Sequence, residues 1–92
     1  MSGRSRFSLG SVETEEVLGA MRRGLQHKDA AIRRASADAL KRLGRLGNDH
    51  QAALVVATLL GALKDAEPAV RESAAAALRK IYPQAAAEAG LK

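Results

Sequence analysis

The strongest constraint on the fold of this chain is an internal repeat that returns the same residue types after 38 positions. Residues 25–43 and 63–81 both read Leu-x6-Ile/Val-Arg-x5-Ala-Leu-Lys/Arg-Arg/Lys-Leu/Ile. A fixed period of this length is typical of arrays in which each repeat is a pair of helices. The matched positions are mostly apolar, so the repeat predicts architecture and names neither a partner nor a reaction.

Length and composition favour one domain built from aliphatic side chains. A chain of 92 residues supports a single core, and Phe7 and Tyr82 are its only aromatic residues. The absence of cysteine excludes disulfides and thiolate metal sites and fits a reducing compartment, so we expect a cytoplasmic protein. The longest apolar run, residues 52–62, is too short for a bilayer span of about 20 residues, so we expect no membrane partner.

Apolar spacing and capping residues predict four main helices. The first starts near Glu13 and carries its apolar stripe at Val17, Leu18, Met21 and Leu25. The second runs from an Asp29 cap to Gly44, and its apolar face is expected to consist of Ile32, Ala35, Ala39, Leu40 and Leu43.

The second half of the chain repeats this arrangement. Asn48 and Gln51 form a predicted capping box at the start of a third helix, which ends near Lys64. Pro68 suits the first position of a fourth helix that ends at Tyr82. We expect residues 1–12 to be a flexible leader, 13–47 and 48–82 to be two repeats of one helical domain, and 83–92 to be a tail that either frays or forms a short fifth helix.

The two turns resemble HEAT repeats. Both read L-x-(H/D)-x-(D/E)-x-x-(I/V)-R, and the likeness, which extends to the short HEAT-like repeats of phycobilin lyase subunits, covers about residues 13–82. It implies an all-α solenoid of two helical hairpins. In that family an Asp six residues before an Arg helps to tie successive repeats together, and Asp65 and Arg71 have this spacing. The first repeat has His27 in place of the Asp and keeps Arg33, which breaks the ladder unless Asp29 substitutes. Armadillo-like and generic hairpin arrays remain open.

The third helix differs from the first in being apolar nearly all round. Across the 38-residue offset Glu16 becomes Leu54, Arg22 becomes Leu60 and Arg23 becomes Gly61. One interpretation is a helix buried on every side; the other is a subunit contact that would make the protein an oligomer. The candidates for self-association are Leu54, Leu60, Ala75 and Ala76.

Positive charge is concentrated in the first repeat. Residues 17–48 carry eight Lys or Arg against Asp29 and Asp38, a net charge of +6. The predicted partner-binding basic face consists of Arg22, Arg23, Arg33, Arg34, Lys41, Arg42 and Arg45. Three interpretations remain: a solvated surface, a contact for an acidic protein, and electrostatic nucleic-acid binding, although single-stranded binders usually add stacking aromatics.

The sequence lacks a recognisable catalytic constellation. His27 and His50 are the only histidines and both fall at helix boundaries, while the acids Glu13, Glu15 and Glu16 are explained by a helix start. We therefore expect no enzyme, metal or cofactor, and predict a protein-protein interaction or assembly module. The alternatives are nucleic-acid binding and, more weakly, an accessory subunit of a lyase-type enzyme.

Overall fold

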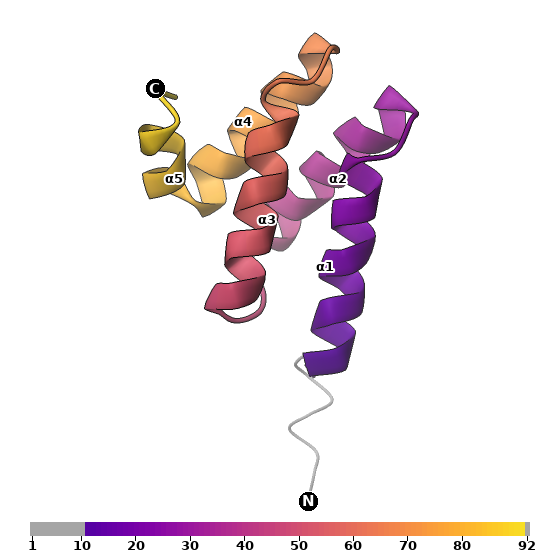
Figure 1. Ribbon diagram of the computed structural model, residues 1–92, viewed down its shortest axis with the longest axis vertical. Helices are drawn as coiled ribbons and strands as arrows, with labels where there is room; N and C mark the ends of the chain where they lie inside the picture. The colour runs from indigo at the N-terminus through magenta and orange to yellow at the C-terminus, as the bar shows by residue number, and fades with distance from the viewer. Residues whose placement is uncertain (1–10, 92) are drawn as a thin grey trace, which may run out of the picture.

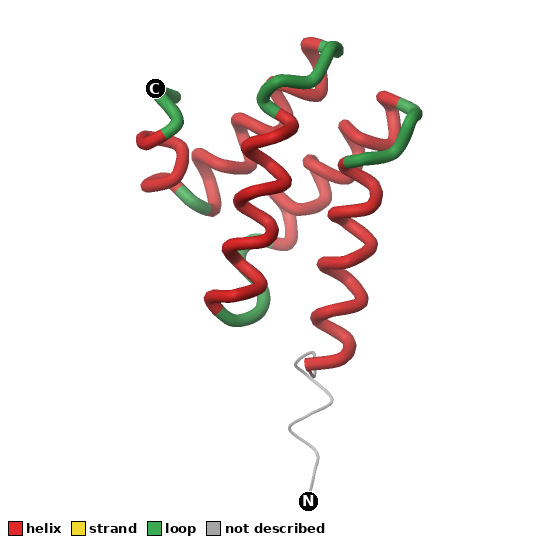
Figure 2. The backbone as a smooth tube through the Cα atoms, in the orientation of Figure 1, coloured by secondary structure: helices red, strands yellow, loops and turns green. Residues whose placement is uncertain are grey.

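The computed structural model describes residues 11–91, and in this range the chain consists of helices joined by short loops and contains no strand (Figures 1 and 2). The helices are α1 (Ser11–Leu25), α2 (Ala30–Leu43), α3 (Asp49–Ala62), α4 (Pro68–Ile81) and α5 (Pro83–Glu88). The predicted leader lies outside the described residues except for positions 11 and 12, which belong to α1. The tail forms a short fifth helix.

The predicted caps of the middle helices are confirmed. Asp29 accepts a hydrogen bond from the Ala31 amide (2.9 Å) and so caps α2. At the start of α3 the Gln51 amide donates to the Asn48 side chain (2.9 Å), and the Asn48 amide donates to the Gln51 side chain (2.8 Å). Both helices therefore start where side-chain oxygens satisfy backbone donors that the helix itself leaves free.

The helices form two hairpins stacked side by side. α1 and α3 lie in one layer and α2 and α4 in the other, and α5 packs against α4 (Figure 1). The most extensive contact between helices is that of α2 with α4, whereas α1 and α3 contact each other less. The arrangement is the predicted all-α solenoid of two hairpins followed by a short helix.

Small side chains bring the helices close together in the core. Leu40, Leu59 and Leu78 are the largest fully buried side chains, and many alanines lie between them. Gly24 of α1 faces Ser36 of α2, where an added Cβ would overlap the serine hydroxyl. Close approach of this kind is what an aliphatic, alanine-rich core requires to avoid cavities.

The predicted apolar face of α2 is only partly buried, through Leu40 and the half-buried Ala39. Ser36, Ala37 and Leu40 are buried, whereas Ala35 is exposed and Ile32 and Leu43 are 40% and 47% exposed. In α4 the equivalent of Ile32 is Val70, which is fully buried because the first repeat lies beside it. In the part of the chain that the structure describes, no repeat precedes α2 to cover the same face.

The interpretation of α3 as buried on every side is wrong. Ala52, Val55, Leu59 and Ala62 are buried, but Leu54 is 38% exposed and Ala53, Ala57 and Gly61 are exposed. The helix therefore has a core face and an apolar outer face. Apolar residues on every side of α3 did not reveal which of its faces are covered by other helices.

Candidate functional site

An open groove lies on the surface of the packed pair α2 and α4 and is lined mainly by charged side chains. α2 contributes Arg34, Asp38, Lys41 and Arg42, and α4 contributes Glu72, Ser73 and Ala76, around a volume of about 300 Å³. Arg34 Nε lies 3.8 Å from Asp38 Oδ2, one helical turn away, so part of the positive charge is balanced locally. Lys41 and Arg42 leave the α2 wall of the groove positive.

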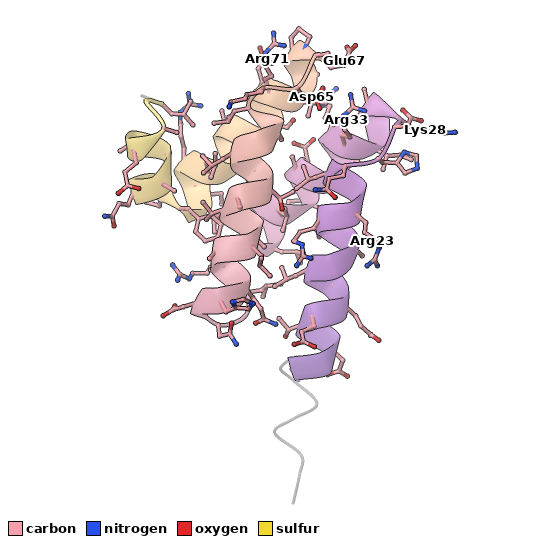
Figure 3. The ribbon with its side chains drawn as sticks, viewed as in Figure 1. Arg23, Lys28, Arg33, Asp65, Glu67 and Arg71 are labelled. Atoms are coloured by element: carbon pink, nitrogen blue, oxygen red, sulfur yellow. The ribbon has the colours of Figure 1, made fainter. Side chains whose placement is uncertain are left out.

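The seven residues of the predicted basic face do not form one surface. Arg34, Lys41 and Arg42 line the groove, whereas Arg22 lines a hollow between α1 and α3 together with Glu15 and His50. Arg23 is exposed on α1 and points away from the molecule (Figure 3).

Arg45 lies beyond the end of α2, not on its polar face. Its guanidinium contacts the Asp49 carboxylate at 3.3 Å and lies 5.7 Å from the centre of the Tyr82 ring. Burial raises the pKa of the Tyr82 hydroxyl, and the charge of Arg45 opposes this effect. Arg45 therefore borders the α4–α5 junction and is separate from the groove.

Arg33 joins the two repeats instead of facing a partner. Its Nε and Nη2 donate to the two carboxylate oxygens of Asp65, at 2.7 and 3.0 Å, and its Nη1 donates to the carbonyls of His27 and Lys28 (Figure 3). The hydrogen bond from Arg33, followed by that from the Glu67 amide, holds the pKa of Asp65 below its ordinary value. The same pair raises the pKa of Arg33. Arg33 is therefore bound within the molecule, which contradicts its predicted place on the partner-binding basic face.

The predicted turn pair of Asp65 and Arg71 is in contact, but through the backbone. Arg71 Nη1 donates to the carbonyls of Asp65 (2.7 Å) and Ala66 (3.2 Å). The Asp65 carboxylate is occupied by Arg33 and by the Glu67 amide. Asp29 caps α2 and does not replace Asp65 in the ladder. Arg33 is equivalent to Arg71 across the 38-residue offset, and Asp65 precedes Arg71 by six residues; this spacing was the sequence signal for the Arg33–Asp65 link.

The four self-association candidates lie on different surfaces. Leu54 is on the outer face of α3, and Leu60 is partly buried against the core. Ala76 lines the groove. Ala75 is only 8% exposed, so its predicted place on a smooth apolar surface is wrong.

The remaining polar candidates have local roles or none that the described contacts reveal. His27 Nδ1 accepts a hydrogen bond from the Asp29 amide at 2.9 Å, which makes it a turn residue, and His50 is exposed at the start of α3. Residues 11–91 contain no cluster of three or more His, Cys, Asp or Glu side chains placed to hold a metal ion. In the same range no helix combines the length and the apolarity that a bilayer span requires.

The second hairpin matches a known family. Residues 55–85, from the middle of α3 into α5, match the family model described as the HEAT repeat. This segment is therefore similar to a HEAT repeat. The resemblance of the chain to the HEAT-like helical-repeat family is thereby confirmed. HEAT repeats generally mediate protein-protein interaction or assembly, and proteins built from them are typically non-catalytic scaffolds. No curated protein and no solved structure gives a significant match to the chain.

Proposed function

We propose that this chain is a non-catalytic protein-binding module that holds an acidic segment of a partner protein in the groove between α2 and α4. The observation that carries the proposal is the α2 wall of that groove, where Lys41 and Arg42 lie beside the ion-paired Arg34. Glu72 and Ser73 on the α4 wall add an acceptor and a hydroxyl to these donors. A groove with both charge signs suits a polypeptide, which carries donors and acceptors along its length.

The distribution of charge favours protein over nucleic acid as the partner. Phosphate-backbone binding gains affinity from many cations placed along one surface. Of the seven predicted basic residues only Arg34, Lys41 and Arg42 share the groove, and Asp38 and Glu72 lie among them. A duplex would meet repulsion at both acids and few compensating contacts.

Binding of simple polyanions tests this proposal. Fluorescence anisotropy would compare labelled poly-L-glutamate, a DNA duplex and an RNA of the same length at about 50 and 200 mM salt. We expect poly-L-glutamate to bind at the lower salt, with an affinity reduced at least about tenfold by Lys41→Glu/Arg42→Glu, because the double change reverses the charge of the α2 wall.

The matched control is Arg23→Glu/Lys28→Glu, which changes the net charge by the same amount at exposed positions outside the groove. The control should retain the affinity for poly-L-glutamate. Equal losses of affinity in both double variants would show a general effect of net charge and would contradict binding in the groove. Tight, salt-sensitive binding of DNA or RNA that depends on Lys41 and Arg42 would make the groove a nucleic-acid site.

A further inference from the structure

The contacts of Arg33 define how one repeat of this chain receives the next. One nitrogen of the guanidinium, Nη1, is fixed by the carbonyls of residues 27 and 28 in its own turn. The other edge, Nε and Nη2, holds both oxygens of Asp65 in the following turn. The guanidinium fork matches a carboxylate in this two-point geometry, which a lysine could not reproduce.

Arg71 repeats half of this arrangement and leaves the other half open. Its Nη1 donates to the carbonyls of Asp65 and Ala66, which are equivalent across the 38-residue offset to those that Arg33 uses. No residue in the range 11–91 provides an acceptor for its Nε and Nη2. Arg71 is exposed at the start of α4, on the side of the turn away from Arg33 (Figure 3). The bonds to the turn hold the guanidinium in place, so less side-chain entropy is lost when the open edge binds a ligand.

A second difference between the repeats lies at the α3–α4 turn, the turn whose carbonyls Arg71 binds. Leu25, at the end of α1, is buried with 4% exposure, whereas its equivalent Leu63, which follows α3, is only partly buried. α5 packs against α4 and buries Tyr82 at the far end of that helix. The α3–α4 turn of the second repeat therefore has the partly buried Leu63 and the unoccupied Nε and Nη2 edge of Arg71.

We propose that Arg71 and Leu63 form a docking surface for a partner protein that places an Asp or Glu side chain on Nε and Nη2 of Arg71, as Asp65 lies on Arg33. The occupant is identified by charge complementarity and by the two-point geometry of the equivalent pair. This surface is distinct from the α2–α4 groove and does not require the groove to be occupied.

A second copy of this chain does not fit the role by stacking head to tail. The position equivalent to Asp65 in its first repeat is His27, whose Nδ1 already accepts the Asp29 amide, as Asp65 accepts the Glu67 amide. A neutral imidazole that accepts through Nδ1 carries its proton on Nε2 and has no acceptor left for a guanidinium. Stacking of a second copy therefore does not supply the carboxylate, and we assign it to a partner protein.

The test is ¹⁵N–¹H NMR of the arginine Nε–Hε groups in the full chain, titrated with an acetylated and amidated peptide of the sequence 63–70. This peptide supplies the carboxylate turn that Arg33 already holds. We expect the Arg71 signal to move and saturate at a peptide concentration at least about tenfold lower than that needed at exposed Arg23. The Arg33 signal should stay in place because its edge is occupied. Arg71→Lys should abolish the perturbation of neighbouring backbone amides.

Three outcomes would overturn the proposal. The first is an Arg71 signal that moves no more than that of Arg23. The second is an equal shift with a peptide carrying Asp65→Asn and Glu67→Gln, which has no carboxylate side chain, because a carboxylate would then not be the group recognised. The third is an equal shift with acetate at the same concentration, which would show a site for any small carboxylate and not for a protein turn.

Discussion

At the scale of single residues, the link between the repeats depends on one arginine and one aspartate. The side chains of Arg33 and Asp65 are 17% and 10% exposed and meet through two hydrogen bonds across 32 residues of sequence. From the sequence, Asp65 was paired with Arg71, and Arg33 was assigned to the basic face. These roles differ because spacing within a turn shows only which residues are near in the chain. It does not show which turn lies beside which helix.

Asp65→Asn should lower the stability of the protein near neutral pH, and the loss should fade in acid. The folded-state pKa of Asp65 is lowered, first by Arg33 and then by the Glu67 amide. The ionised carboxylate therefore stabilises the fold fully above the ordinary pKa of about 4, and this contribution disappears as the pH falls through the lowered folded value. Urea unfolding of both proteins across this range measures the effect.

Asp49→Asn provides the control for that comparison. Asp49 also pairs with an arginine, Arg45, but its side chain is fully exposed, so water screens the interaction. The control should change stability little at any pH. A stability difference for Asp65→Asn that is independent of pH would show that the carboxylate charge is not what joins the repeats.

At the scale of helices, the sequence predicted the starts of α2, α3 and α4 because caps are local. Asp29, Asn48, Gln51 and Pro68 act within one turn of their own positions. The buried faces were harder to predict, because burial depends on neighbours that the sequence does not place. Ile32 and Val70 occupy equivalent positions in equivalent helices, yet one is exposed and the other fully buried.

Two glycine-to-alanine changes should have opposite effects on stability. At Gly24 a Cβ would overlap Ser36 Oγ and lie 3.0 Å from Ser36 Cβ, so α1 and α2 must separate at a cost of about 1–3 kcal/mol. At Gly61 in α3 nothing lies within 4 Å of the added Cβ, and alanine should stabilise the helix by about 0.5–1 kcal/mol. Chemical denaturation measures both. Stabilisation by Gly24→Ala would contradict the close contact of α1 with α2.

At the scale of the whole molecule, the two hairpins form a short array whose ends differ. α5 packs on α4 at one end, while Ile32 and Leu43 of α2 are exposed at the other. The period of 38 residues was enough to predict the array, because period reports the repeating unit. The groove was only partly predictable: Arg34, Lys41 and Arg42 were identified, but Glu72 and Ser73 line it only because α4 packs beside α2.

The proposed function requires that the groove between α2 and α4 binds protein. The most direct measurement is quantitative mass spectrometry of proteins that co-purify with the unaltered chain, with Lys41→Glu/Arg42→Glu, and with Arg23→Glu/Lys28→Glu. We expect acidic proteins to co-purify with the unaltered chain and with Arg23→Glu/Lys28→Glu, and to be lost with Lys41→Glu/Arg42→Glu. Co-purification of the same proteins in the same amounts with all three chains would contradict it.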